Sequence, residues 1–223
     1  MRVMSTLALQ GVVEALRPGF EATHGVVLQA EFLPTAVLMP RLRSKETADV
    51  VLLTAEAIGA LVAEGLVRGE TRRDLARSFV GVAVKAGAVW PDISTAGAFV
   101  AALQGARSVA MSRQGASGIF LAGLLERLGI TEMVRGKAVV IESGFTGELA
   151  ARGEVELALQ QVSELMVVPG VDVVGRLPAE LGGETVFSGG VMVGAAEAEV
   201  GVALLEAIVG AEEVLVAKGL EGV

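Results

Sequence analysis

Small hydroxyl residues and glycines stand at four places where a strand-like run passes into a helical pattern. They are Ser5-Thr6, Pro34-Thr35-Ala36, the loop from Ser112 to Ser117-Gly118, and Ser143-Gly144. A helix N-terminus presents unpaired N–H groups and a partial positive charge, so it favours a small anion. Any one of these residues is also explained as an ordinary helix cap. Because such junctions share the carboxyl edge of a parallel sheet, the four together predict an anion site.

Three charged residues lie beside these junctions. Arg113 is inside the third loop, where a guanidinium can bind a carboxylate or an oxyanion through two hydrogen bonds, or simply face solvent. Glu31 and Glu142 lie at strand ends beside two of these junctions and are the candidate proton acceptors if the site does chemistry. Otherwise they bond to neighbouring backbone or face solvent. The chain has no cysteine and one histidine, so we expect no metal and no cofactor.

Composition narrows the class of protein. The 223 residues are 52% hydrophobic and carry a formal charge of −8, which argues against nucleic-acid binding. The longest charge-free run, Ile93 to Ala106, is too short to cross a bilayer, so no membrane insertion is expected. The N-terminus lacks a signal-peptide pattern. We therefore expect a cytoplasmic protein as the chain stands, or a periplasmic one if a leader was trimmed.

Strand and helix patterns alternate in two series, which predicts mostly parallel sheets flanked by helices. Strands are expected at 2–5, 26–31, 50–53, 108–111, 138–141, 157–161 and 184–193, and helices at 9–23, 35–42, 56–64, 95–104, 118–128, 145–151 and 196–218. Extended runs at 78–85 and 166–178 separate the series. We expect lobe 1 to comprise 1–79 and 178–223 and lobe 2 to comprise 80–177, with extended crossings near 79–86 and 168–177.

Six segments carry a resemblance to a known family. They are FEATHGVVLQAEF, ADVVLLTAEAIGALVAEGLV, DLARSFVGVAVKAGA, ASGIFLAGLLERLGI, ARGEVELALQQVSEL and PGVDVVGRLPAEL. The chain resembles the molybdate-binding-protein-like group of type II periplasmic binding proteins over nearly its full length, within a divergent subgroup. The resemblance implies two α/β lobes, a two-stranded hinge, and a ligand held in the cleft between the lobes by helix N-termini and hydroxyls.

The resemblance also implies which positions touch the ligand. The family's first-junction serine falls nearest Ala8, with Ser5 and Thr6 as substitutes, and its second-junction serine pair corresponds to Thr35-Ala36. The third-junction small residue corresponds to Ser117, the fourth-junction backbone donor to Ser143 or Gly144, and the oxyanion-binding tyrosine to Gln161. The chain has no tyrosine. Together with Arg113, these departures favour an organic carboxylate over a metal oxyanion.

Two functions follow from such a cleft. The first is a monomeric solute-binding protein that closes over a small anion, which we expect to be an organic carboxylate, and that would supply a membrane transporter (an ABC importer) if the protein is exported. The alternative is an isomerase of an unsaturated carboxylic acid, such as aconitate, that moves an allylic proton. Arg113 and the helix N-termini would then stabilise the developing enolate-like charge, and Glu31 or Glu142 would be the base. A ligand-sensing domain is a third possibility.

Overall fold

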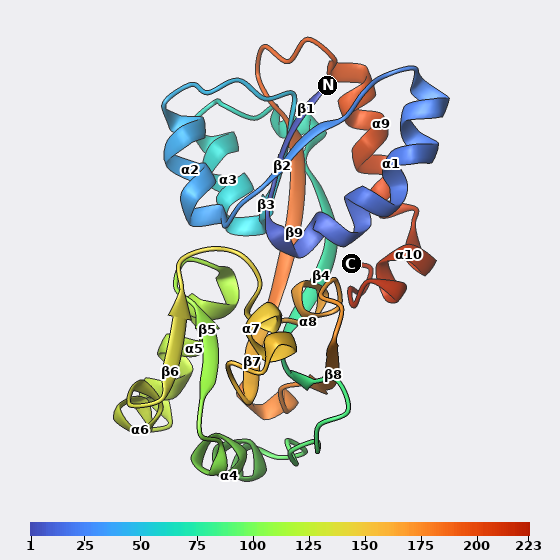
Figure 1. The fold of residues 1–223 in the computed structure, drawn as a ribbon. Coiled ribbons are helices and arrows are strands. Elements are labelled where there is room, and N and C mark those ends of the chain that lie inside the picture. The colour runs from blue at the N-terminus through green and yellow to red at the C-terminus, as the bar shows by residue number, and fades with distance from the viewer. The chain divides into compact units, whose positions relative to one another are not determined.

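The chain divides after Ser78 and after Glu184 into two units, each with its own sheet (Figure 1). The computed structural model describes residues 1–223. Unit 1 comprises Met1–Ser78 and Thr185–Val223, and unit 2 comprises Phe79–Glu184. The long strand β4 (Arg73–Lys85) starts in unit 1 and continues into unit 2, and β9 (Glu184–Val191) returns the chain to unit 1.

The unit 1 sheet has the order β2-β1-β3-β9, with β4 beside β9. Strands β1 (Arg2–Ser5), β2 (Gln29–Phe32) and β3 (Val50–Thr54) are parallel, and β9 is antiparallel to β3. Apolar side chains alternate between the two faces because strand residues point up and down in turn. Val3, Val50 and Leu52 lie on one face of the sheet, and Met4, Val51 and Leu53 on the other.

Two groups of helices cover those faces of unit 1. The first face packs on α1 (Gln10–His24, after a 3-10 turn at Leu7–Leu9), α9 (Ala198–Val209) and α10 (Glu212–Ala217). The second packs on α2 (Thr35–Arg43) and α3 (Ala55–Ala63). A 3-10 turn at Gly69–Thr71 precedes β4. The parallel strands β1, β2 and β3 are followed in the chain by α1, α2 and α3, so these three helices begin at the same edge of the sheet.

The unit 2 sheet has the order β8-β4-β7-β5-β6. Strands β5 (Val109–Ser112), β6 (Ala138–Ile141) and β7 (Leu157–Gln161) are parallel. Strand β4 is antiparallel to β7, and β8 (Val171–Arg176) is antiparallel to β4. The helices are α4 (Ala96–Gly105), α5 (Ala116–Arg127), α6 (Thr131–Arg135), α7 (Thr146–Arg152) and α8 (Val162–Leu165), with a 3-10 turn at Ala179–Leu181.

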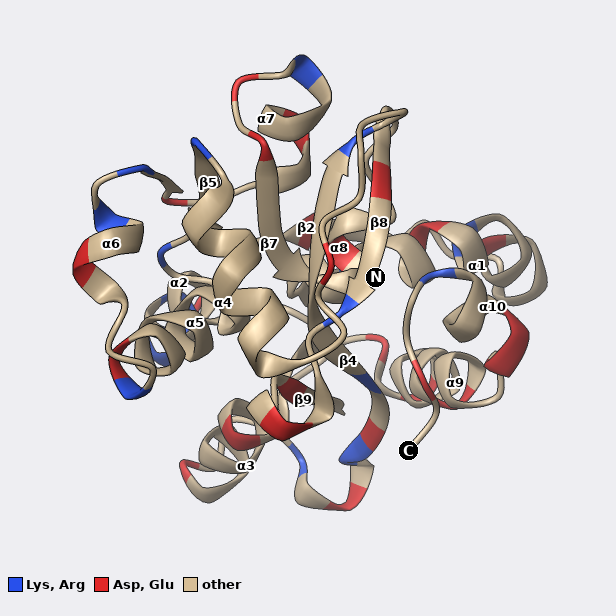
Figure 2. Ribbon diagram, turned by 90° about the horizontal axis from the view of Figure 1, so that it is seen from below, with Lys and Arg blue, Asp and Glu red and all other residues tan.

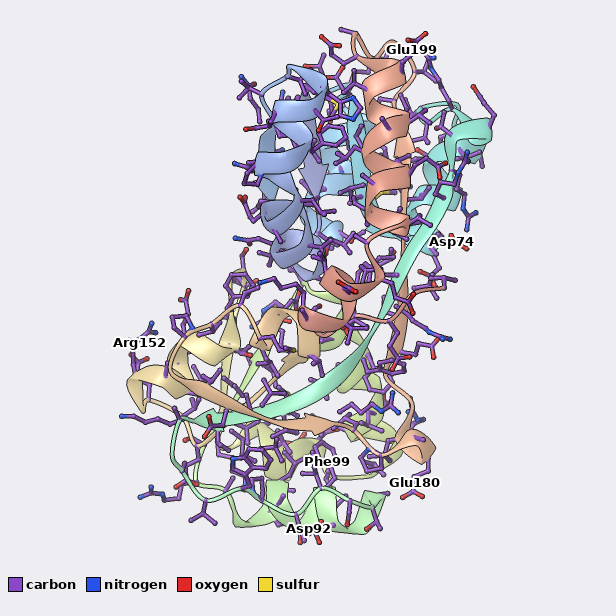
Figure 3. The ribbon with its side chains drawn as sticks, turned by 90° about the vertical axis from the view of Figure 1, so that its right-hand side faces the viewer. Asp74, Asp92, Phe99, Arg152, Glu180 and Glu199 are labelled. Atoms are coloured by element: carbon purple, nitrogen blue, oxygen red, sulfur yellow. The ribbon has the colours of Figure 1, made fainter.

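The two faces of the unit 2 sheet carry side chains of different size. Val109, Leu157 and Leu159 face a core that contains Phe99 of α4, which lies inside the unit, whereas Asp92 and Glu180 lie on its outer side (Figure 3). The other face presents the alanines Ala83, Ala110 and Ala158 to α7 and α8. These short side chains let α7 lie close to the sheet, so its N-terminus meets the strand ends.

The predicted fold class, two α/β units with mostly parallel sheets flanked by helices, is confirmed by the comparisons reported below. Two local expectations were wrong. The run 166–178 is not one extended stretch, because α8 ends just before it and β8 begins only at Val171. The expected C-terminal helix 196–218 is two helices, α9 and α10, interrupted at Gly210-Ala211.

The second boundary between the units lies after Glu184, later than the 177/178 expected from the sequence. Leu177 and Leu181 belong to the unit 2 core. The Leu177 N–H donates to the Val80 carbonyl at 2.8 Å, and the Val80 N–H donates to the Gly183 carbonyl at 2.9 Å. These bonds keep 178–184 with unit 2. The segment 168–177, expected as a crossing, therefore lies inside unit 2, with β8 paired to β4.

Charges of both signs are interspersed on the elements of each unit (Figure 2). In unit 2, α6 carries the pair Arg135–Glu132, and α7 carries Arg152 beside Glu148 and Glu154. In unit 1, Arg43 pairs with Glu64. None of the helices combines the length and the apolar character that crossing a membrane requires.

Candidate anion site

The junction between β5 and α5 holds two buried hydroxyls that make no hydrogen bond. Ser112 ends β5 and is 6% exposed, and Ser117 in the first turn of α5 is fully buried. Neither Oγ has a partner in the structure. Gly115 is the N-cap residue of α5 and offers no side-chain cap, so the first N–H groups of the helix also lack an intrahelical acceptor. The junction therefore offers several donors together.

Glycines bring these donors close to one another. A Cβ built on Gly115 would lie 2.8 Å from the Ser112 Oγ and 3.7 Å from the Ser117 Oγ, so both hydroxyls lie near the start of α5. A Cβ on Gly118 would lie 1.9 Å from the Ser112 carbonyl oxygen, so only glycine allows the helix to lie this close to β5. We call Ser112, Ser117 and the first N–H groups of α5 the α5 anion site.

The neighbouring junction, between β6 and α7, is held by the side chain of Gln160. Its Oε1 accepts from the Thr146 N–H at 2.7 Å and from the Thr146 Oγ1 at 3.0 Å, and its Nε2 donates to the Gly144 carbonyl at 2.9 Å. Strand β5 pairs with β7 through Ala110 and Ala158. Ser112 and Gln160 each lie two residues beyond this pair, so their side chains point to the same face at the ends of adjacent strands. Ser143 and Gly144 thus lie in a loop tied to the end of β7.

A buried carboxyl group, Glu164, lies at the third junction of this edge, between β7 and α8. Gln161 and Glu164 form a capping box, in which the Gln161 N–H donates to the Glu164 Oε2 at 3.3 Å. Glu164 is 4% exposed. Burial raises its pKa to about 8, against the lowering effects of the Gln161 N–H and the Gln160 side chain. Sequence reasoning missed this residue, although the spacing Gln161–Glu164 resembles a capping box.

Arg113 and Glu142 lie together at the start of their loops. The Arg113 Nε donates to the Glu142 Oε1 at 2.6 Å, and the Gln114 Nε2 donates to the Oε2 at 3.3 Å. Both side chains are exposed, at 63% and 62%. Arg113 also lines, with Ser112, Gly118 and Arg135, a pocket of about 300 Å³ between β5, α5 and α6. A ligand carboxylate would have to exchange with Glu142 to reach the Arg113 guanidinium.

In unit 1, the predicted hydroxyls differ in their bonding. The Ser5 Oγ donates to the Thr6 carbonyl at 3.0 Å, and the Thr6 N–H donates to the Leu52 carbonyl at 2.8 Å. The Thr35 Oγ1 at the first residue of α2 is buried and makes no hydrogen bond. Thr54, which sequence reasoning omitted, caps α3 by accepting from the Ala57 N–H at 3.4 Å. Thr35 is thus the hydroxyl of unit 1 that most resembles those at α5.

Glu31 lies in an ion-pair cluster of unit 1. Arg41 donates to both its oxygens, at 2.8 and 2.7 Å, and also donates to Glu46. The hydrogen bond from Arg41 lowers the pKa of Glu31, which makes the carboxylate a weaker base. Arg41 is six residues after Thr35 on α2, about 9 Å along the helix axis. The pairing therefore engages both oxygens of the Glu31 carboxylate.

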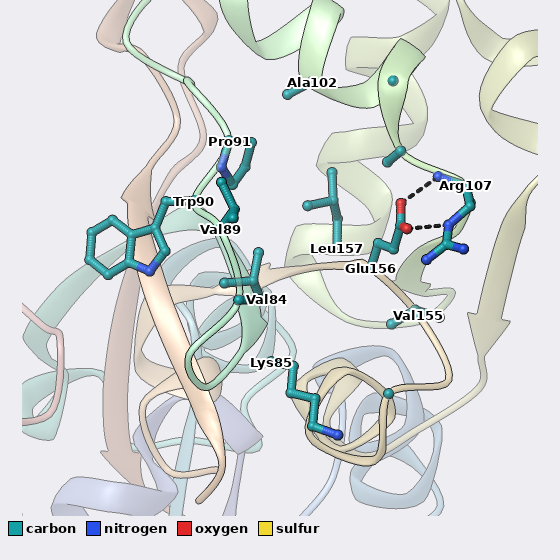
Figure 4. A pocket seen from close by; sticks show the side chains of 14 residues that line it. Val84, Lys85, Val89, Trp90, Pro91, Ala102, Arg107, Val155, Glu156 and Leu157 are labelled. Atoms are coloured by element: carbon teal, nitrogen blue, oxygen red, sulfur yellow. Dashed lines mark hydrogen bonds and ion pairs between the residues drawn. The ribbon is translucent and has the colours of Figure 1, made fainter.

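A larger pocket, of about 560 Å³, lies at the opposite edge of the unit 2 sheet. Its lining is mostly apolar and includes Val84, Val89, Trp90 and Leu157, with Lys85 at one side (Figure 4). Two charged residues of the lining, Arg107 and Glu156, are bonded to each other: the Glu156 carboxylate accepts from both the side chain and the N–H of Arg107. The α5 anion site, with its unpartnered donors, is the better match for an anion.

Comparison with known proteins agrees with this fold. The structure superposes on the periplasmic molybdate-binding protein of Azotobacter vinelandii with a TM-score of 0.80 and 18% identity, covering 99% of this chain and 98% of that one. The sulfate-binding protein of Mycobacterium tuberculosis H37Rv gives a TM-score of 0.77 and 15% identity, covering 100% and 86%. The chain therefore has the α/β periplasmic-binding-protein fold, as its sequence motifs predicted.

The sequence itself identifies the family. Residues 1–221 match the bacterial extracellular solute-binding protein family, and the chain belongs to it. The chain is also 37% identical, over 212 residues, to an aconitate isomerase of a Pseudomonas species, covering 92% of this chain and 80% of that protein. The relatives thus include binders of small inorganic anions and an enzyme of a tricarboxylic acid.

Proposed function

We propose that this protein isomerises an unsaturated polycarboxylic acid of the aconitate type by moving an allylic proton. The observation that carries the proposal is the 37% identity to an aconitate isomerase over 92% of the chain. The α5 anion site supports it, because its two free hydroxyls and helix N–H groups suit a carboxylate. The reaction only relocates a proton and a double bond, so it needs neither an oxidant nor a cofactor.

The residues of unit 2 have distinct roles in this proposal. Ser112, Ser117 and the α5 N–H groups bind one carboxylate and stabilise the negative charge that develops when the allylic proton leaves. Arg113 binds a second carboxylate in exchange for Glu142. Ser143, Gly144 and Gln161 border the same edge of the sheet, and with Ser5, Thr6 and Thr35 of unit 1 they stay predicted ligand contacts. The cleft expected between the lobes also stays a prediction.

The direct test is turnover. We expect the purified protein to interconvert cis- and trans-aconitate, with the two isomers distinguished by their vinyl proton signals in NMR spectra. Heat-denatured protein is the control for spontaneous isomerisation. An absence of interconversion of either isomer at high protein concentration would remove aconitate as the substrate.

A second candidate function, solute binding without chemistry, is favoured by the family and by the likeness to molybdate- and sulfate-binding proteins. A ligand that binds only the folded state raises the melting temperature, so a thermal-shift series separates the ligand classes. We expect shifts with di- and tricarboxylates. Strong shifts with molybdate or sulfate and none with carboxylates would overturn the carboxylate proposal. A transporter partner stays a prediction of the solute-binding function.

The two buried hydroxyls should contribute measurably to binding. We expect Ser112→Ala and Ser117→Ala each to weaken tricarboxylate binding by about 1.5–3 kcal/mol, roughly 10- to 150-fold, because each removes a hydrogen bond to a charged group. Isothermal titration calorimetry measures the loss. Ser44→Ala, which removes an exposed hydroxyl of unit 1, is the matched control. Unchanged affinity in both serine variants would show that the carboxylate binds elsewhere.

A further inference from the structure

We propose that Glu164 is the catalytic residue that removes and returns the allylic proton. This inference rests on the proposed isomerase function and names the proton carrier of that same site. Neither earlier candidate suits the task equally well. Arg41 donates to both oxygens of Glu31 and lowers its pKa, and Glu142 is an exposed partner of Arg113.

The geometry places the Glu164 carboxyl at the edge of the sheet that carries the α5 anion site. Although Glu164 is the third residue of α8, the capping box turns its side chain back to the Gln161 N–H, at the end of β7. Strand β7 lies next to β5, whose last residue is Ser112. The Glu164 carboxyl and the Ser112 hydroxyl therefore belong to the ends of adjacent strands.

A hydrogen-bonded side chain joins this carboxyl to the rest of the edge. The Gln160 side chain bonds to Glu164; its Oε1 also accepts from the Thr146 N–H, and its Nε2 donates to the Gly144 carbonyl. The amide therefore fixes the carboxyl relative to the start of α7. Positioning of this kind is what a proton carrier requires, because proton transfer depends on hydrogen-bond distances.

The surroundings of Glu164 favour its protonated form without the help of a neighbouring charge. Helix α8 packs on β7, β8 and α7, and the charged residues of those elements are engaged elsewhere. Asp172 accepts from the Gly87 N–H, Arg176 stacks on Phe79, and Arg152 of α7 pairs with Glu148 and Glu154. Burial, not a neighbouring charge, raises the pKa of Glu164 to about 8. A base is most effective when its pKa lies near the working pH.

The proposed step balances without any co-reactant. The ionised Glu164 carboxylate takes a proton from the substrate's methylene carbon, so a C–H bond breaks and an O–H bond forms. The electron pair moves into the allylic unit and its adjoining carboxylates, where the α5 anion site stabilises it. The Glu164 O–H then returns the proton to the other end of the allylic unit, the double bond has shifted, and the carboxylate is regenerated.

The test compares Glu164→Gln with the wild type and with Glu126→Gln, which makes the same chemical change on the exposed side of α5. We expect Glu164→Gln to lower kcat for aconitate at least 100-fold, the usual contribution of a positioned acid–base group. It should still bind propane-1,2,3-tricarboxylate, a saturated analogue, within threefold of the wild type. Glu126→Gln should keep both properties within twofold.

A pH profile separates catalysis from a structural role. Wild-type kcat/KM should rise with pH and reach half of its maximum near pH 8, because the ionised form of Glu164 is the base. Glu164→Asp should keep a carboxyl-dependent rise at reduced rate. Full activity of Glu164→Gln would overturn this inference. So would a loss of both activity and analogue binding, because the residue would then have a structural role. Either outcome leaves the proposed isomerase function in place. An inactive wild type overturns the proposed function itself.

Discussion

Replacing Gly118 with alanine is expected to abolish anion binding and to lower the free energy of unfolding by about 3 kcal/mol. The new Cβ would lie 1.9 Å from the Ser112 carbonyl oxygen and 2.9 Å from its Oγ. The first of these atoms is backbone, so no side-chain rotation relieves the clash, and overpacking of this kind costs about 1–3 kcal/mol or more. The start of α5 must move away from β5, which separates the two serine hydroxyls. Urea unfolding and calorimetric titration with a tricarboxylate measure the two effects.

Gly123→Ala on the same helix is the matched control. A Cβ there meets only the Arg127 Nη1, at 3.9 Å, so no atom has to move. Alanine is a better helix former than glycine by up to about 1 kcal/mol, and this variant should be slightly more stable than the wild type. Equal stability of the two variants would show that α5 does not lie against the end of β5 as described.

Local patterns were enough to predict the elements that form the edges of the site. The strands Arg2–Ser5, Ala138–Ile141 and Leu157–Gln161 have the bounds expected from the sequence, because short apolar runs between turn residues define them. The Ser112–Gly118 loop was likewise predicted as a strand-to-helix junction. What its hydroxyls bond to was not predictable, because the answer depends on how closely α5 lies against β5.

Contacts between distant residues account for what the sequence could not show. Arg113 and Glu142 are 29 positions apart, and their pairing follows from the parallel register of β5 and β6. Glu164 lies in a four-residue helix too short to produce a periodic pattern, and in sequence it looks like an ordinary exposed glutamate. It is buried because helix α8 packs on α7, β7 and β8. A buried carboxyl of this kind is found only from the tertiary structure.

The buried state of Glu164 has a consequence for stability, which should fall as pH rises between about 5 and 8. The pKa of Glu164 is about 8 in the folded protein and near the ordinary 4.5 when unfolded. Between these values the folded state keeps a proton that the unfolded state has released, so raising the pH favours unfolding by up to about 1.4 kcal/mol per pH unit. Over this window the loss is about 3 kcal/mol, and urea unfolding at pH 5, 6, 7 and 8 measures it.

Glu164→Gln isolates this effect, because an amide of the same shape has no proton to lose. The difference in unfolding free energy between Glu164→Gln and the wild type should grow in favour of the variant from pH 5 to pH 8. Carboxylates held by arginines, such as Glu31 and Glu156, have lowered pKa values, so any stability they contribute is lost on acidification below this window. Glu31 and Glu156 are present in both the wild type and Glu164→Gln, so their contributions cancel in the difference. A difference that does not change with pH would mean that Glu164 is ionised in the folded state throughout. The carboxyl would then be a permanent anion beside the α5 anion site, where it would repel the carboxylate that the serines bind.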